Sequence, residues 1–184
     1  MKKVLTKSDI KKYYKQFMLK KIGISGQKKI LDSKVLIIGA GGLGCPLILY
    51  LAYSGVGNIG IVDHDKIELS NLSRQVLFTK KDIGKYKTLV SKKAAKKINQ
   101  RINVKTFTKK LNSSNINKIA KSYPIICDGS DNFETRLLIN DYCIKNKKIL
   151  VSSAISRFDG QLFYFDFLER KLRVLDVLCQ KTLD

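Results

Sequence analysis

The sequence has no apolar run that approaches the roughly 20 residues needed to span a bilayer. Its basic N-terminus is not followed by the apolar stretch of about 7–15 residues that marks a secretory signal. Internal repeats and low-complexity linkers are also absent. These absences predict a cytoplasmic protein, and a length of 184 residues suits one domain with a continuous core.

The four cysteines, Cys45, Cys127, Cys143 and Cys179, contain no CxxC pair. The sequence therefore shows neither a zinc knuckle nor a redox dithiol. Cys45 follows the glycine cluster at the start of an apolar helix, and Cys127 ends an apolar run. Both positions predict reduced thiols that pack in the interior.

Acidic residues are scarce: 15 Asp and Glu stand against 36 Lys and Arg, a net charge of +21. There is no helix-turn-helix, zinc-finger or aromatic-basic ribonucleoprotein motif, and the lysines are spread along the chain. This pattern disfavours nucleic acid as a partner. It favours an acidic protein partner, because opposite charges speed the encounter of two proteins.

Strand patterns and helix patterns alternate along the chain. A helix over 84–100 would turn Leu89, Ala94, Ala95 and Ile98 inward and lysines outward. The strand at 160–167 alternates like an exposed edge, and residues 1–30 predict one or two helices outside the sheet. The predicted strands are 34–39, 58–63, 103–109, 123–129, 148–154 and 160–167, and the other predicted helices are 43–55 and 132–146.

This order predicts an α/β fold with right-handed crossovers, a Rossmann-like, doubly wound and mostly parallel sheet with helices on both faces. Residues 1–30 would form an N-terminal helical extension, and residues 31–184 the nucleotide-binding domain. In such folds ligands bind beyond the carboxyl ends of the strands.

The segment "GAGGLG" (39–44) follows a strand, precedes a helix and fits G-x-G-x-x-G. Glycines here let the backbone turn tightly and approach a phosphate, which the helix N-terminus attracts. Asp63, about 20 residues further on, can accept hydrogen bonds from ribose hydroxyls. Both NAD and ATP carry ribose, so the loop and Asp63 leave the nucleotide open.

The polar stretch "DHDKIELSNLSRQ" (63–75), followed by Lys87, favours ATP. Arg74 and Lys87 could clamp a polyphosphate, for which a dehydrogenase has little need. In "CDGSDN" (127–132), Asp128 and Asp131 supply the hard oxygen ligands that suit nucleotide-borne Mg²⁺. The alternatives are that Asp131 caps the following helix and that Arg74 forms a surface ion pair.

Together these motifs, with "DIGKYK", "CDGSDNFETR" and "VSSAISRFDGQ", resemble the MoeB/ThiF/HesA family, the bacterial relatives of ubiquitin-activating enzymes. The likeness runs from about Tyr14 to Phe167. It implies an ATP-dependent adenylyltransferase that activates the C-terminal glycine carboxylate of a ubiquitin-like sulfur carrier (MoaD/ThiS type), for molybdopterin or thiamine synthesis. It further implies a homodimer and a cysteine desulfurase or other sulfur donor as partners.

The resemblance also implies residue roles. Asp63 would hold the ribose, Asp131 would bind Mg²⁺, and Arg74 and Lys87 would stabilise the charge on the reacting phosphates together with the metal. The residues expected to bind the nucleotide are Gly39, Gly41, Gly42, Gly44, Asp63, Asp65, Asn71, Arg74, Gln75 and Lys87.

The sequence departs from the family pattern in two places. The family's N-terminal "RQ" pair, whose arginine reaches the neighbouring subunit's nucleotide, is here Lys15 and Gln16, so the bidentate fork is lost. The family's two zinc-binding CxxC pairs do not appear before the chain ends at Asp184, and Cys179 matches neither motif. No zinc site is therefore expected within these residues.

Three other functions stay open at this stage. The chain could bind ATP without turnover, or dehydrate threonylcarbamoyl-adenosine in tRNA as a related family with the same loop does. A NAD-dependent oxidoreductase would bind NAD independently of Mg²⁺.

Overall fold

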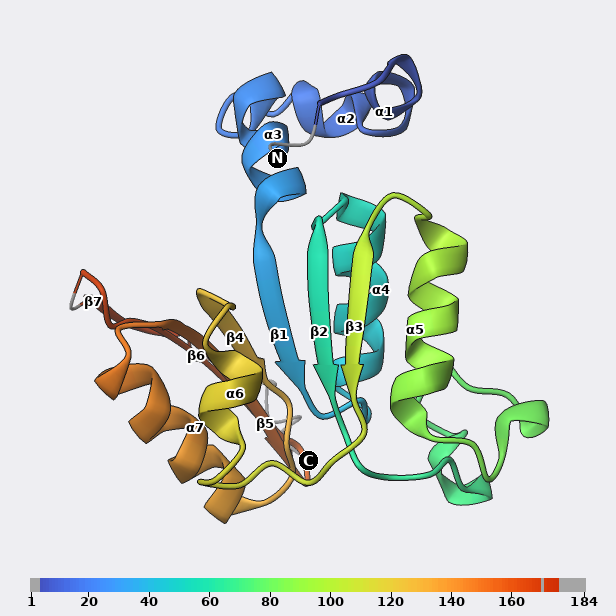
Figure 1. The fold of residues 1–184 in the computed structure, drawn as a ribbon, viewed down its shortest axis with the longest axis vertical. Coiled ribbons are helices and arrows are strands. Elements are labelled where there is room, and N and C mark those ends of the chain that lie inside the picture. Colours follow the sequence, from blue (N-terminus) through green and yellow to red (C-terminus); the bar gives the residue numbers. More distant parts are fainter. Residues whose placement is uncertain (1–3, 170, 176–184) are drawn as a thin grey trace, which may run out of the picture.

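The computed structural model describes residues 4–169 and 171–175, which form a seven-stranded sheet with the order β3-β2-β1-β4-β5-β6-β7 (Figure 1). The first five strands in that order are parallel, and the last two are antiparallel. The expected mostly parallel, doubly wound sheet is therefore confirmed. The strands are β1 (Lys34–Ile38), β2 (Asn58–Val62), β3 (Asn103–Phe107), β4 (Ile125–Asp128), β5 (Ile149–Ser156), β6 (Asp159–Asp166) and β7 (Lys171–Leu175).

Helices cover both faces of the sheet, and the side chains along β1 alternate between the two resulting cores. Val35 and Ile37 pack in the cluster that includes residues of α4 (Gly44–Ser54) and α5 (Lys87–Ile98). Leu36 and Ile38 pack in the other cluster, with residues of α6 (Ile116–Ala120) and α7 (Phe133–Lys145). A strand buried on both faces reads as a continuous apolar run, as "VLII" does.

Two elements were not expected, and one expectation about the sheet was wrong. The short helix α6 and the strand β7 carry no clear periodic signal in the sequence. Because β7 pairs with β6 along Leu162–Asp166, β6 is an inner strand and not an edge. The alternation in "GQLFYFDF" correctly predicted that β6 is partly buried, but such a pattern cannot reveal that another strand pairs with it.

The inward face of α5 includes Ala95 and Ile98 as expected, but it does not include Leu89. Leu89 is 52% exposed, whereas Thr88, Ser91 and Ala95 are buried at helical spacing. Thr88 and Thr108 share a hydrogen bond of 2.7 Å between their hydroxyls. The helix therefore approaches the sheet through small residues, and Leu89 lies about 100° away from that stripe.

The N-terminal segment forms three helices where one or two were expected: α1 (Lys7–Lys12), α2 (Tyr14–Phe17) and α3 (Gly23–Asp32). The last of these runs past residue 30, and β1 begins two residues after it ends. They lie beyond the amino ends of the strands (Figure 1). No helix among the described residues is long and apolar enough to cross a membrane.

Buried contacts fasten this helical segment to the domain. The Tyr13 side chain is 1% exposed, and its hydroxyl accepts a hydrogen bond of 2.9 Å from Asn99 Nδ2. The same Asn99 amide donates to the Ala52 carbonyl at 3.1 Å, and Asp9 forms an ion pair with Arg101. The extension is thus part of the domain's interior packing.

Candidate nucleotide site at the carboxyl ends of the strands

The glycine loop 39–44 lies between the ends of β2 and β4. The Gly39 amide donates to the Val62 carbonyl at 2.9 Å, and the Gly129 amide donates to the Ile38 carbonyl at 2.9 Å. Gly39 has a φ of 89°, and a Cβ there would lie 2.8 Å from the Gly129 carbonyl oxygen. A Cβ on Gly44 would overlap the Gly39 carbonyl oxygen. Both positions therefore require glycine.

The start of α4 offers unused hydrogen-bond donors. Within the part of the chain that the structure describes, the amides of Gly41, Gly42, Leu43 and Gly44 donate to no protein acceptor. A helix N-terminus with free amides and a positive dipole end attracts phosphate. The loop geometry thus fits the predicted approach of a nucleotide phosphate.

Asp63 follows β2 and holds this loop in place. Its Oδ2 accepts a hydrogen bond of 2.7 Å from the Ala40 amide, and its Oδ1 accepts one of 2.8 Å from the Asp65 amide. Each carboxylate oxygen can accept a second bond. Asp63 therefore couples the end of β2 to the loop, and its role as a ribose ligand stays a prediction.

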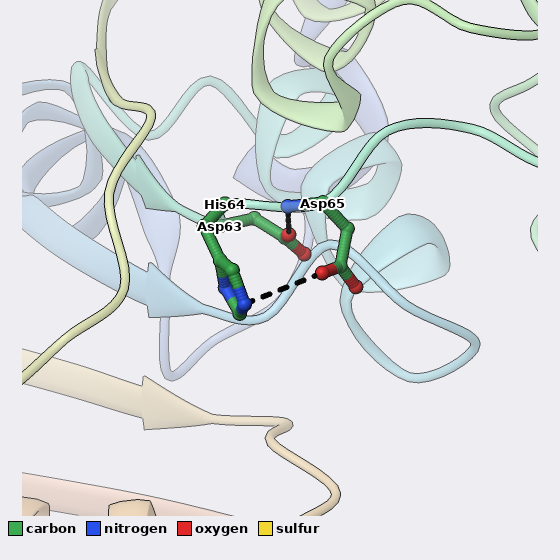
Figure 2. A group of neighbouring side chains, drawn as sticks. All are labelled: Asp63, His64 and Asp65. Atoms are coloured by element: carbon green, nitrogen blue, oxygen red, sulfur yellow. Dashed lines mark hydrogen bonds and ion pairs between the residues drawn. The ribbon is translucent and has the colours of Figure 1, made fainter.

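Figure 2 shows how Asp63, His64 and Asp65 gather at this point. One ligand atom from each lies within 4.8 Å of the others, and His64 Nε2 is 3.5 Å from Asp65 Oδ1. The Asp63 oxygens already serve backbone amides, and Asp65 Oδ2 binds Lys87 Nζ at 2.8 Å. The arrangement therefore serves to order the backbone and to hold a lysine.

Lys87 is the buried cation of the site. It is 6% exposed at the start of α5, and its amide donates to the Asp65 carbonyl at 3.0 Å. The Lys87 side chain is 8% exposed and that of Asp65 is 50% exposed, so solvent can reach only the carboxylate partner. The lysines of this helix were predicted to point outward, and Lys87 does not.

This asymmetry predicts different costs for the two halves of the pair. Asp65→Asn should lower the free energy of unfolding by about 1–3 kcal/mol, because it leaves a buried ammonium without its counter-charge. Lys87→Met keeps the apolar stem and leaves only a half-exposed carboxylate, so its cost should stay below about 1 kcal/mol. Urea unfolding at neutral pH measures both, and an equal or larger loss for Lys87→Met would contradict the expectation.

Asn71 ends the short helix at Leu69–Asn71, and Arg74 and Gln75 follow it. Arg74 is exposed, and its Cγ and Cδ lie 3.7 Å from where a Cβ on Gly42 would be. Its Nη1 donates to the Ser70 carbonyl at 3.1 Å and forms no ion pair within the described residues, which removes the surface ion-pair alternative. The guanidinium thus lies beside the glycine loop.

Gln75 lies beside Gly41 of the glycine loop. It is 3% exposed, and its Nε2 is 4.0 Å from the position of a Cβ on Gly41. Its Oε1 is buried and has no hydrogen-bond donor among the described residues. Asn71 is also buried, and its Oδ1 accepts from the Glu68 amide at 3.1 Å, which orders the turn. The Gln75 Oε1 could accept a hydrogen bond from a ligand hydroxyl or amine, but not from a phosphate oxygen, which is itself an acceptor.

The two aspartates of "CDGSDN" have different environments. Asp128 is 2% exposed, and its carboxylate accepts hydrogen bonds from the Ser130 amide (3.0 Å), the Ser130 hydroxyl (2.6 Å) and the Ser152 hydroxyl (2.9 Å). Asp131 is exposed and accepts no hydrogen bond from the described residues. Asn132, not Asp131, caps α7 by accepting from the Thr135 amide at 2.8 Å. Asp131 is therefore the carboxylate available to a metal.

Three side chains that build this corner were not predicted from the sequence: Ser130, Arg136 and Ser152. They lie inside the quoted motifs "CDGSDNFETR" and "VSSA". The sequence gives little indication of their role, because Ser and Arg at these spacings do not form a motif with a defined chemistry. Only the fold brings β4, α7 and β5 together.

The cysteines in the described part of the chain are packing residues, as expected. Cys45, Cys127 and Cys143 are buried and free. Burial raises the pKa of the Cys45 thiol to about 11 and those of Cys127 and Cys143 to about 12. Because the thiolate is the nucleophile, these thiols are inert near neutral pH. Cys179 lies outside the described residues.

The raised pKa values predict slow thiol chemistry. In a Cys179→Ser variant at pH 7.5, a disulfide reagent such as DTNB should label less than about one tenth of the thiols in the folded protein within minutes. The same reagent in urea should titrate all the remaining cysteines. Rapid labelling of the folded variant would show that one of the described cysteines is exposed or activated.

An apolar cavity of about 150 Å³ lies next to the site. It is lined by Leu43 and Leu47 at the start of α4, by the end of β4, and by Val151 and Leu162. Gly44 and Asp128 also contribute to its wall, so it borders both the glycine loop and the carboxyl end of β4. A slender apolar or backbone segment of a substrate could enter here.

Comparisons with known proteins agree with this geometry. The ThiF family model matches residues 13–182. A probable molybdopterin-synthase adenylyltransferase of Porphyra purpurea is 45% identical over 156 residues, covering 85% of this chain and 41% of the relative. A sulfur carrier protein adenylyltransferase of Thermus thermophilus is 41% identical over 160 residues, covering 87% of this chain and 59% of the relative.

A solved structure shares the fold. The E. coli tRNA N6-threonylcarbamoyladenosine dehydratase in complex with ATP superposes with a TM-score of 0.77 at 22% identity, covering 82% of this chain and 61% of that one. That likeness supports the architecture alone. The family match covers nearly the whole chain and includes the loop, the polar segment and the aspartate corner just described. This chain belongs to the ThiF family.

Proposed function

We propose that the chain carries the ATP-binding half of an adenylyltransferase that activates the C-terminal glycine carboxylate of a ubiquitin-like sulfur carrier. The chain spans 41% and 59% of the length of the two relatives described above, so the complete reaction is part of the proposal. The observation that carries it is the convergence of free loop amides, Lys87, Arg74 and Asp131 at one edge of the sheet.

In this proposal the amides at the start of α4 receive phosphate oxygens, and Asp63 binds the ribose in addition to the loop. Arg74 approaches from the exposed side of the loop, and Lys87 exchanges part of its contact with Asp65 for a phosphate. Asn71 and Gln75 complete the polar wall. The residues present thus fit a triphosphate better than a dinucleotide, because two cations flank the loop.

Asp131 suits Mg²⁺, because it is an exposed carboxylate, has no hydrogen-bond partner among the described residues and lies next to an ordered turn. The metal would neutralise phosphate charge and orient the pyrophosphate leaving group. Zinc plays no part in this proposal.

The reaction is an in-line displacement. A carboxylate oxygen of the carrier attacks the α-phosphorus, the bond from that phosphorus to the bridging oxygen breaks, and pyrophosphate leaves. The carboxylate is already ionised near neutral pH, so no general base is needed. Catalysis then consists of positioning and charge stabilisation by Arg74 and Lys87.

The proposed partners follow from the same reading. A sulfur carrier would present its C-terminal tail beside the apolar cavity near Gly44, and a cysteine desulfurase or other donor would supply sulfur afterwards. We also propose a homodimer. Lys15 is exposed on α2, beyond the opposite ends of the strands, so it could meet a nucleotide only in a second copy. Molybdopterin or thiamine synthesis in the cytoplasm is the setting that we propose.

The test is ATP–pyrophosphate exchange with Mg²⁺ and a purified carrier that ends in Gly-Gly. Exchange that requires the carrier, and that is lost when its last glycine is removed, is the expected result. ATP binding without exchange would favour a nucleotide-binding protein without turnover. ATP-dependent cyclisation of threonylcarbamoyl-adenosine in tRNA, without carrier-dependent exchange, would favour the dehydratase.

A further inference from the structure

The turn that carries Asp131 is tied to the sheet through Asp128. The buried Asp128 carboxylate accepts from the amide and hydroxyl of Ser130, which curls the turn back toward the end of β4. The Ser152 hydroxyl on β5 donates to the same carboxylate at 2.9 Å. The Ser153 hydroxyl donates to the Asp128 carbonyl at 3.3 Å. The start of the turn is therefore fixed to β5.

Arg136, in the first turns of α7, holds the next part of the turn. Its Nη2 donates to the Ser130 carbonyl at 2.7 Å and to the Ser153 carbonyl at 2.6 Å. Both hydrogens of this one guanidinium nitrogen are therefore donated, one to the turn and one to β5. Charged donors make short and strong hydrogen bonds, and Arg136 is half-buried, where water competes less.

The residue after Asp131 is held as well. The Asn132 side chain accepts from the Thr135 amide, and the Asn132 carbonyl accepts from the Arg136 amide at 3.3 Å. Both neighbours of Asp131 are therefore fixed, Ser130 by the Arg136 side chain and Asn132 by the helix cap. The Asp131 carboxylate itself accepts no hydrogen bond from the described residues.

We propose that Arg136 is a positioning residue that orients the Asp131 carboxylate for Mg²⁺ by clamping the Ser130 carbonyl to β5. This inference rests on the proposed function, in which Asp131 is the metal ligand. Arg136 does not touch the nucleotide in this proposal. Groups that orient a metal ligand affect metal affinity about 10–100-fold when they are removed.

The experiment measures ATP binding by calorimetry at increasing Mg²⁺, with the whole chain. We expect Arg136→Ala to raise the Mg²⁺ concentration for half-maximal enhancement of ATP binding by about tenfold. ATP affinity without Mg²⁺ should change by less than about twofold, since the phosphate contacts remain. Arg136→Lys should recover part of the loss, because lysine can keep one of the two carbonyl contacts.

A double-mutant cycle separates positioning from a general effect on structure. In an Asp131→Ala background, Arg136→Ala should have no further effect on the Mg²⁺ dependence, because the ligand that it orients is gone. Arg157→Ala is the matched control, since Arg157 is an exposed arginine in the turn between β5 and β6. It should behave like the wild type.

The outcomes are distinguishable. A wild-type chain whose Mg²⁺ response does not depend on Asp131 would refute the metal site of the proposed function. An Asp131-dependent response that Arg136→Ala and Arg136→Lys leave unchanged would refute the inference and leave the proposed function standing. Equal loss of ATP affinity with and without Mg²⁺ would also refute it. Urea unfolding identifies a variant that does not fold, and Arg136→Lys then decides.

Discussion

Gly44→Ala should abolish ATP binding and lower the free energy of unfolding by about 3 kcal/mol or more. A Cβ at this position would overlap the Gly39 carbonyl oxygen, which is backbone and cannot rotate away. Gly39 in turn has a positive φ and lies against Gly129, so it has no room to retreat. The added methyl group must therefore separate the loop from α4 or from β4. Urea unfolding and calorimetry with ATP measure the two effects.

Gly41→Ala is the matched control within the same loop. The nearest atom to a Cβ on Gly41 is Gln75 Nε2 at 4.0 Å, so the fold has room for the methyl group. Its unfolding free energy should stay within about 0.5 kcal/mol of the wild type. ATP affinity should still fall, because the methyl group adds bulk to the loop whose free amides are proposed to receive the phosphates. A Gly44→Ala variant as stable as Gly41→Ala would show that the loop is not packed as described.

Asp131→Ala should reduce Mg²⁺-dependent ATP–pyrophosphate exchange by about 10²–10³-fold. The structural reason is that Asp131 is exposed, whereas Asp128 is 2% exposed and already accepts three hydrogen bonds from two serines. No other carboxylate in this turn can replace Asp131. Because the side chain is exposed and forms no hydrogen bond or ion pair with the described residues, the unfolding free energy should change by less than about 0.5 kcal/mol.

Two further variants serve as comparisons for that result. Asp141→Ala, an exposed acid further along α7, should leave exchange unchanged. Asp128→Asn should lower stability, because a buried carboxylate with three donors loses acceptor capacity and charge. Near-normal exchange in Asp131→Ala would mean that the metal lies elsewhere, and the cluster around Asp65 would be the next place to examine.

The central sheet could be predicted from the sequence because its strands are buried on both faces. The apolar run "VLII" and the crossover helices leave few topologies once right-handed connections are required. Predictions became worse toward β6 and β7. There the sheet turns antiparallel, one strand is half-buried, and pairing depends on contacts that alternation does not encode. On α5 the inward positions of Ala95 and Ile98 were predicted correctly, whereas Leu89 was misplaced because close packing selected Thr88 and Ser91.

The site was predictable where a residue's role follows from the backbone around it. Gly39 and Gly44 need to be glycine for reasons that the motif states and the structure bears out. The burial of Lys87 and the separate environments of Asp128 and Asp131 depend on distant segments. No local pattern distinguishes a carboxylate that is satisfied by β5 from one that is free. The roles of these residues in binding and catalysis stay predictions.

The docking of the N-terminal helices has a consequence for the order of events during synthesis. Tyr13 leaves the ribosome early, but the Asn99 amide that donates to its hydroxyl, and the Ala52 carbonyl that holds this amide in place, come from two later crossovers. Arg101, the ion-pair partner of Asp9, comes later still. The first segment to be made must therefore wait for roughly ninety more residues, several seconds at ordinary rates of translation, before it can dock. What is synthesised first in this chain is packed in place only after β1 and β2 have been made.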